Sequence, residues 1–214
     1  MIDVIPGILE KEWSAIEERL KLVAPHVDWV QIDIADNTLV PNETLLDFTN
    51  FSQEKLSSEL KHLSFEAHLM VANPEKYIKP LADAGFKRII AHVECTDPRL
   101  FLEQATYEHV EVGIAIDGPS ELELVEPFLD QVDTVLVMTI EAGFSGQEFM
   151  QDTVEKIRRI HENLPDLPIE VDGGINDKSS KVVRDVGATR LVSTSFIFKH
   201  PDGIATAIEQ LKNG

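Results

Sequence analysis

The sequence predicts an α/β fold, a single-domain (β/α)8 TIM barrel, and three observations support this prediction. Short β-branched runs alternate eight times with amphipathic segments, which is typical of a parallel sheet with right-handed helical crossovers. The 214 residues leave about 27 for each strand–helix unit, which is enough for a compact closed barrel. No linker, composition change or low-complexity segment divides the chain, so we expect residues 1–214 to form one domain.

Each predicted strand is a short apolar run rich in Val and Ile. The eight runs are residues 3–8, 29–34, 64–70, 88–92, 110–116, 134–139, 169–172 and 190–193. An open doubly wound sheet is the alternative, but it would place a Gly-rich phosphate turn after its first strand. Here the first strand carries Pro6-Gly7-Ile8-Leu9, which does not fit that fingerprint, so the closed barrel is favoured.

Helices are predicted where apolar residues recur at helical spacing between the strands. These segments are residues 10–23, part of 45–60, 74–84, 98–104, 120–129, 152–163, 177–186 and 201–211. Pro74, Pro98 and Pro201 suit first-turn positions of helices. Gly85 and Gly187 stand where helix C-caps are expected, each shortly before a strand.

Composition excludes several classes of partner. Hydrophobic residues make up 43% of the chain, enough for a sizeable core, and the single cysteine, Cys95, excludes an internal disulfide. The net charge of −19 repels nucleic acid and anionic lipid, so we expect no nucleic-acid or membrane partner. With no signal peptide and no apolar stretch of about 20 residues, a cytoplasmic location is expected, and a homo-oligomer stays open.

Two carboxylates stand at the ends of buried strands, where the active site of a barrel lies. Asp33 ends one apolar run and Asp172 another. An ionised carboxylate in a dry interior costs several kcal/mol unless it is paired or bound to a metal. Either aspartate alone could equally cap the following helix, but the pair indicates acid/base chemistry.

Neighbouring side chains favour a metal site at these aspartates. Gln31 lies on the same side of its strand as Asp33, and His68 belongs to the next strand, with Asp172 across the barrel mouth. Two carboxylates, an imidazole and an amide oxygen can hold a divalent cation, although His68 alone could equally be a core histidine. His92 and Glu94 are interpreted as a structural or outer-layer pair of that site.

Three late turns predict a phosphate site. Glycines let backbone N–H groups approach an oxyanion closely, and the following helix N-termini add favourable dipoles. The turns follow the last three strands, the usual phosphate corner of this barrel. Their candidate residues are Gly143, Phe144, Ser145, Gly146, Gly173, Gly174, Thr194 and Ser195.

The chain resembles the ribulose-5-phosphate 3-epimerase family along residues 5–198. The resemblance is carried by Asp33-Ile34-Ala35-Asp36 with Val40-Pro41-Asn42, His68-Leu69-Met70-Val71 with Asn73-Pro74-Glu75, Leu136-Val137-Met138-Thr139 with Gly143-Phe144-Ser145-Gly146-Gln147, Val171-Asp172-Gly173-Gly174-Ile175, and Ser195-Phe196-Ile197-Phe198. It implies a pentose-phosphate isomerase that interconverts D-ribulose 5-phosphate and D-xylulose 5-phosphate through an enediolate.

The resemblance also implies roles for single residues. Asp33 and Asp172 would be the catalytic acid and base, and together with Gln31 and His68 they would hold a divalent ion such as Zn, Mn or Fe(II). The ion would act as a Lewis acid that stabilises the enediolate. Met70 and Met138 would line the reacting centre, although ordinary core filling explains them equally well.

Departures from the family pattern gather at the site. Gln31 replaces a histidine ligand, Gly7 replaces a serine that contacts substrate, and Ala35 replaces a methionine. An amide oxygen binds zinc more weakly than imidazole does, so weaker metal binding or a harder ion is expected.

Three alternatives stay open beside the pentulose-phosphate epimerase. The first is a ketohexose 6-phosphate 3-epimerase, which keeps the chemistry and changes the sugar. The second is a barrel that binds a sugar phosphate without turnover. The third, a phosphate-handling decarboxylase, is disfavoured because the chain has no Asp-x-Lys-x-x-Asp arrangement to supply its lysine.

Overall fold

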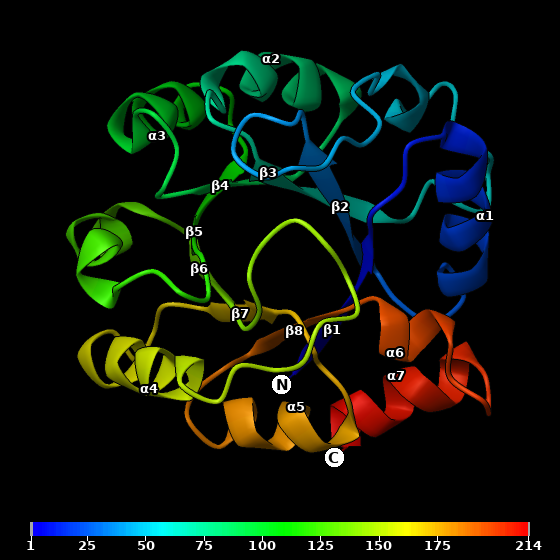
Figure 1. Cartoon of the computed structure of the whole chain (residues 1–214). Coiled ribbons are helices and arrows are strands. Elements are labelled where there is room, and N and C mark those ends of the chain that lie inside the picture. The colour runs from blue at the N-terminus through cyan, green and yellow to red at the C-terminus, as the bar shows by residue number, and fades with distance from the viewer. Residues whose placement is uncertain (1, 214) are drawn as a thin grey trace.

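Eight parallel strands close into a barrel in sequence order, as predicted. The computed structural model describes residues 2–213. Each strand pairs with the next, and β1 pairs with β8 to complete the closure (Figure 1). The strands are β1 (Asp3–Ile8), β2 (Trp29–Ala35), β3 (Ser64–Met70), β4 (Arg88–His92), β5 (Glu111–Ile116), β6 (Thr134–Met138), β7 (Ile169–Asp172) and β8 (Arg190–Ser193).

The helices form a ring outside the barrel (Figure 1). They are α1 (Trp13–Val23), α2 (Glu75–Ala84), α3 (Pro98–Thr106), α4 (Thr153–Asn163), α5 (Asp177–Arg184), α6 (Ser195–Phe198) and α7 (Ile204–Asn213). None of the helices within residues 2–213 has the length and apolar character that a bilayer crossing demands.

Local sequence explains where several helices begin and end. Asp97 accepts the backbone N–H of Leu100 at 3.1 Å and caps α3, whose first residue is Pro98. Asn176 and Ser179 form a reciprocal capping box at the start of α5. Gly85 ends α2 in the left-handed conformation, with a φ of +94°.

Two of the predicted helices are wrong. Segment 120–129 contains only the 3-10 turns η2 (Leu122–Leu124) and η3 (Glu126–Gln131), because Pro127 lacks the N–H that an α-helix needs there. Segment 45–60 contains only η1 (Thr49–Phe51).

Side chains in segment 45–60 bond their own backbone and so compete with a helix. Asp47 accepts the N–H of Thr49 at 3.0 Å, and the Ser52 hydroxyl donates to the Thr49 carbonyl at 3.1 Å.

Two predicted helix starts are also wrong. α1 begins at Trp13 rather than at residue 10, and α7 begins at Ile204 rather than at residue 201. Gly203 adopts a φ of +88° just before α7, so Pro201 lies in the preceding turn and not in the first turn of the helix.

The barrel interior is layered, and its layers position the site. Near the N-terminal ends of the strands, Arg88 forms ion pairs with the buried Glu66 and with Glu111, and its guanidinium lies 4.2 Å from the centre of the Trp29 ring. Above this layer lies an apolar cluster made of Ala35, Val40, Met70, Ile90, Ala115, Leu136, Met138, Ile140 and Ala142. The polar side chains of Asp33, His68 and Asp172 lie beside this cluster, at the C-terminal ends of the strands.

Candidate active site

Three strands bring the predicted metal and acid/base residues to one place. In the parallel pairing of β2 with β3, Asp33 stands opposite His68. Gln31 precedes Asp33 by two residues and so points the same way. Asp172, the last residue of β7, approaches from the far side of the opening. All four side chains converge, as the sequence predicts.

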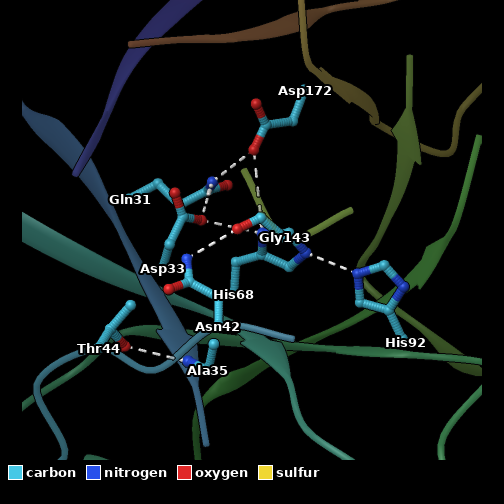
Figure 2. A network of polar contacts seen from close by, with 9 residues as sticks. All are labelled: Gln31, Asp33, Ala35, Asn42, Thr44, His68, His92, Gly143 and Asp172. Atoms are coloured by element: carbon cyan, nitrogen blue, oxygen red, sulfur yellow. Dashed lines mark hydrogen bonds and ion pairs between the residues drawn. The ribbon is translucent and has the colours of Figure 1, made fainter. Parts of the chain in front are cut away.

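The Gln31 amide lies between the two carboxyl groups. Its Nε2 donates to Asp33 Oδ1 at 2.8 Å and to Asp172 Oδ2 at 2.7 Å (Figure 2). His68 Nδ1 lies 3.0 Å from Asp33 Oδ1 and 3.9 Å from Asp172 Oδ2. One amide and one imidazole therefore connect carboxylates that are 139 positions apart in the chain.

Burial changes the acidity of both aspartates. It raises the pKa of Asp33 to about 7, although the hydrogen bond from Gln31 and the charge of His92 act in the opposite direction. Burial and the charge of Asp33 raise the pKa of Asp172 to about 7 as well. Near neutral pH the pair therefore holds about one proton, which provides one acid and one base in the same site.

His68 is neutral in this environment. Burial, reinforced by the charge of His92, lowers its pKa to about 3. A neutral imidazole keeps one nitrogen lone pair, which is the form that binds a metal.

The donor set fits a divalent cation. One ligand atom each from Asp33, His68 and Asp172 lie within 4.8 Å of one another. Gln31 Oε1 is buried and has no hydrogen-bond partner among the described residues. Turning the amide over would place this oxygen where Nε2 now faces the two carboxylates. Two carboxylate oxygens, an imidazole nitrogen and an amide oxygen are ligands that divalent first-row metals accept.

Two small cavities adjoin these residues. The first, of about 30 Å³, is lined by Asp33, His68 and Asp172 together with Leu9, Met70, Met138, Ile140, Gly143, Phe144, Ser145 and Thr194. The second, of about 20 Å³, is lined by the predicted phosphate turns, namely Ser145, Gly146, Gly173, Gly174, Thr194 and Ser195, with Ile140, Asp172, Ile175, Val192 and Ser193. The residues predicted to bind phosphate therefore lie directly beside Asp33 and Asp172.

Glycine is required in the turn after β7. Gly173 has a φ of +114°, and a Cβ there would meet Ile140 at 2.3 Å. Gly174 has a φ of +64°, and its Cβ would meet the backbone nitrogen of Phe149 at 2.8 Å. Both positions combine a left-handed backbone with close packing, which only glycine tolerates without strain.

Gly7 lies at the edge of the same site. It stands opposite Gln31 in the pairing of β1 with β2. A Cβ at Gly7 would meet the Thr194 hydroxyl at 2.8 Å. Because Gly7 has no side chain, the turn after β8 can lie close to the β1 backbone. Phe144, Ser145 and Gly146 in the turn after β6 are exposed, and 51% of Phe144 is open to solvent.

The loop between β6 and α4 covers the site. It crosses the barrel opening as the yellow-green segment of Figure 1. Asn42 Nδ2 donates to the Gly143 carbonyl at 2.8 Å and so holds the loop against the segment that follows β2 (Figure 2). The sequence predicts no role for Asn42, because 101 residues separate it from its partner.

His92 and Glu94 lie behind His68 as an outer-layer pair of the site, where the sequence places them. His92 Nε2 lies 2.8 Å from His68 Nε2, and His92 Nδ1 lies 3.1 Å from Glu94 Oε2. Burial would raise the pKa of Glu94, but the hydrogen bond and charge of His92 and the N–H of Asp117 lower it to about 2. The His-x-Glu spacing at the end of β4 predicts this pair, but not the contact of His92 with His68.

Comparison with known proteins gives consistent matches. The model of the ribulose-phosphate 3 epimerase family matches residues 3–198. The chain is 31% identical to the ribulose-phosphate 3-epimerase of Schizosaccharomyces pombe, over 98% of this chain and 92% of that protein. It is also 31% identical to the ribulose-phosphate 3-epimerase, cytoplasmic isoform, of Oryza sativa, over 99% and 94% of the two chains.

A solved structure shares the fold. The 3-hexulose-6-phosphate synthase of Salmonella typhimurium superposes with a TM-score of 0.71 at 17% identity, over 98% of this chain and 96% of that one. At this identity the likeness concerns the barrel alone.

Proposed function

Because the chain belongs to the ribulose-phosphate 3-epimerase family, and is therefore an isomerase, we propose that it interconverts D-ribulose 5-phosphate and D-xylulose 5-phosphate by proton transfer between two aspartates. One observation carries the mechanism. Asp33 and Asp172 meet at the Gln31 amide, and burial places the pKa of each at about 7. Inverting a carbon centre needs an acid on one face and a base on the other, and two such carboxyls supply both.

The proton moves between these groups and C3 of the sugar. The ionised aspartate removes the C3 proton on its own face, and the protonated aspartate returns a proton to the opposite face. The reverse reaction exchanges the two roles. The burial of both carboxyls keeps bulk water away from the intermediate, which protects it from protonation by solvent.

Asp33, His68, Asp172 and Gln31 would hold a divalent cation beside the reacting carbons. A cation in that position supplies Lewis-acid stabilisation of negative charge on the substrate oxygens. His68 would contribute Nδ1, which is its nitrogen nearest to both carboxylates. Gln31 would contribute Oε1 after a turn of its amide, and it is the weakest of the four ligands.

The substrate phosphate would bind at the turns of Gly143–Gly146, Gly173–Gly174 and Thr194–Ser195. The cavity that these turns line adjoins the carboxylate cavity, which supports this assignment. No Lys or Arg occurs in the turns themselves, so backbone N–H groups would supply the attraction. Given the net charge of −19, such a local donor set is what allows an anionic substrate to bind.

A cytoplasmic location is part of the proposal. It is supported by the similarity to the cytoplasmic isoform of Oryza sativa.

A coupled assay tests the proposal. Formation of D-xylulose 5-phosphate from D-ribulose 5-phosphate is followed with metal-stripped protein, to which zinc, manganese or iron(II) is added back. We expect turnover that depends on an added divalent ion. If neither this substrate nor a ketohexose 6-phosphate is epimerised with any of the ions, the protein is a sugar-phosphate-binding barrel rather than an epimerase.

A further inference from the structure

The hydroxyl of Thr194 has no hydrogen-bond partner within the described residues 2–213. Thr194 stands at the N-cap of α6, where a threonine hydroxyl ordinarily accepts a backbone N–H of the helix, but here it makes no such bond. The neighbouring Ser193 differs, because its hydroxyl donates to the Ile175 carbonyl at 2.8 Å. The Thr194 hydroxyl is therefore available both to donate to and to accept from a bound molecule.

The β1 backbone leaves room for this hydroxyl. β8 pairs with β1 (Figure 1), and Pro6 stands opposite Ser193. The next residues, Gly7 and Thr194, also lie close together, since a Cβ at Gly7 would be 2.8 Å from Thr194 Oγ1. The same Cβ would be 3.8 Å from Nε2 of Gln31, the amide that joins the two aspartates. The hydroxyl therefore occupies the space that a side chain at position 7 would need, close to the acid/base pair.

Thr194 also lies between the two cavities of the site. It lines the carboxylate cavity together with Asp33 and Asp172, and it lines the phosphate cavity together with the turn after β7. Ser145 lines both cavities as well, but it is exposed on the loop that covers the site, whereas Thr194 is partly buried at the end of the barrel. Thr194 thus presents its hydroxyl from the barrel itself.

The proposed substrate carries one hydroxyl in the corresponding place. When C3 lies between the aspartates and the phosphate lies at the three turns, the atoms that connect them are C4 and C5. C5 bears the phosphate ester, so C4 is the one carbon of the two with a free hydroxyl. That hydroxyl, like the one on Thr194, can donate and accept a hydrogen bond.

We propose that the Thr194 hydroxyl forms a hydrogen bond with the C4 hydroxyl of the sugar phosphate and thereby determines specificity for substrates that carry it. The placement of C3 and of the phosphate rests on the proposed function. A sugar phosphate without the C4 hydroxyl would leave the Thr194 hydroxyl without a partner and would therefore bind more weakly. Thr194 takes no part in proton transfer at C3.

Three variants separate the hydroxyl from the rest of the side chain. Thr194→Val removes the hydroxyl and keeps the branched shape, and Thr194→Ser keeps the hydroxyl and is the conservative rescue. The matched control is Thr189→Val, just before the opposite end of β8. The Thr189 hydroxyl bonds the Ile169 carbonyl at 3.4 Å and lines neither cavity.

The test is titration calorimetry with D-ribitol 5-phosphate, which has the C4 hydroxyl but no ketone and so is not epimerised, and with its 4-deoxy form. We expect the Kd of D-ribitol 5-phosphate to rise about two- to tenfold in Thr194→Val, to recover in Thr194→Ser and to stay unchanged in Thr189→Val. The unaltered protein should bind the 4-deoxy form more weakly by a similar factor. Thr194→Val should then bind the 4-deoxy form no more weakly than the unaltered protein does.

Two outcomes would overturn the proposal. Equal weakening of both compounds in Thr194→Val would mean that the hydroxyl contacts another atom of the ligand, and no weakening of either would mean that it contacts none. If Thr194→Val does not fold, Thr194→Ala replaces it, with the same pattern expected.

The assay of D-ribulose 5-phosphate epimerisation, run on the same proteins, separates this proposal from the proposed function. If the expected binding pattern appears but the unaltered protein epimerises no substrate, the proposed function fails and the contact of Thr194 stands. If the unaltered protein epimerises D-ribulose 5-phosphate but the binding pattern is absent, the contact fails and the proposed function stands. If neither compound binds and no substrate is epimerised, both are wrong.

Discussion

At the scale of single residues, Gln31 decides how the two aspartates share the site. Its amide donates to both carboxyl groups, at 2.8 and 2.7 Å, while its oxygen has no partner among the described residues. An unpaired buried oxygen costs about 1–3 kcal/mol. A turn of the amide that let its oxygen bind a cation would remove this cost, so the proposed metal site would use the side chain that joins the two aspartates in the metal-free protein.

We predict that Gln31→His tightens zinc binding. Imidazole is a stronger ligand for zinc than an amide oxygen, so the affinity should rise about tenfold or more. Metal analysis of protein purified without chelator, followed by a competition titration, measures the change. Gln31→Leu, which offers no metal ligand at position 31, is the comparison variant. Activity that survives exhaustive chelation, with no divalent ion retained by either protein, would refute the metal-assisted mechanism.

At the scale of elements, the loop between β6 and α4 determines access to the site. The carboxylate cavity under it measures about 30 Å³, which is too small for a pentulose phosphate. We therefore expect this loop, part of which lines the cavity, to move when substrate enters. In the structure it is held down by the bond from Asn42 to the Gly143 carbonyl.

We predict that Asn42→Ala lowers kcat/KM several-fold. Loss of one hydrogen bond is worth about 0.5–1.5 kcal/mol, and it should reduce the fraction of molecules whose loop closes over bound substrate. Steady-state kinetics measure this effect, and faster proteolysis within residues 142–148 reports the opening of the loop. Asn50→Ala, in the turn η1, is the control and should change neither property.

The turn after β7 offers a second test at this scale. We predict that Gly174→Ala weakens the binding of substrate and of inorganic phosphate together, because the added Cβ would meet the Phe149 backbone at 2.8 Å and displace the N–H groups of the turn. Gly203→Ala is the control: it also has a positive φ, but no atom lies within 4 Å of its Cβ. Anion density at another corner of the barrel in phosphate-soaked crystals would contradict the assignment.

The elements show how far the sequence alone predicts this structure. All eight strands are confirmed to within one residue at either end, because a buried parallel strand is a nearly continuous apolar run that stands out in the sequence. The convergence of Asp33, His68 and Asp172 also follows from strand order and side-chain alternation.

What the sequence does not predict depends on side-chain geometry or on distant pairing. Segments 45–60 and 120–129 carry helical spacing but form 3-10 turns, since local side-chain bonds in the first and Pro127 in the second outweigh the pattern. The contact of His92 with His68 depends on how both rings rotate, and the pairing of Asn42 with Gly143 depends on a loop that closes across the barrel. Neither leaves a periodic signal.

At the scale of the whole molecule, the buried carboxyls make stability depend on pH. Asp33 and Asp172 have pKa values of about 7 in the folded chain, against 3.8 as the ordinary value. The folded state therefore binds their protons more tightly than the unfolded state does. Their contribution to the free energy of unfolding is fully present below about pH 4 and is lost as the pH rises through about 7.

We predict that metal-stripped protein loses stability between about pH 5 and about pH 8 more steeply than the double variant Asp33→Asn/Asp172→Asn, whose amides do not titrate. The difference should reach several kcal/mol, because each pKa unit corresponds to about 1.4 kcal/mol. Urea unfolding at the two pH values measures it, and added zinc should restore stability at the higher pH only in the unaltered protein. Parallel pH dependence in both proteins would show that the aspartates keep ordinary acidity.

The most direct test of the two-aspartate mechanism is hydrogen exchange at C3 of the substrate in deuterated water. We predict that Asp33→Asn and Asp172→Asn each epimerise at least 10²- to 10⁴-fold more slowly, since each lacks one acid/base group. Each variant should still exchange the C3 proton of one epimer with solvent, and the two variants should differ in which epimer that is, because one base remains on one face. Loss of exchange for both epimers in one variant, with near-normal epimerisation in the other, would contradict the assignment of one aspartate to each face.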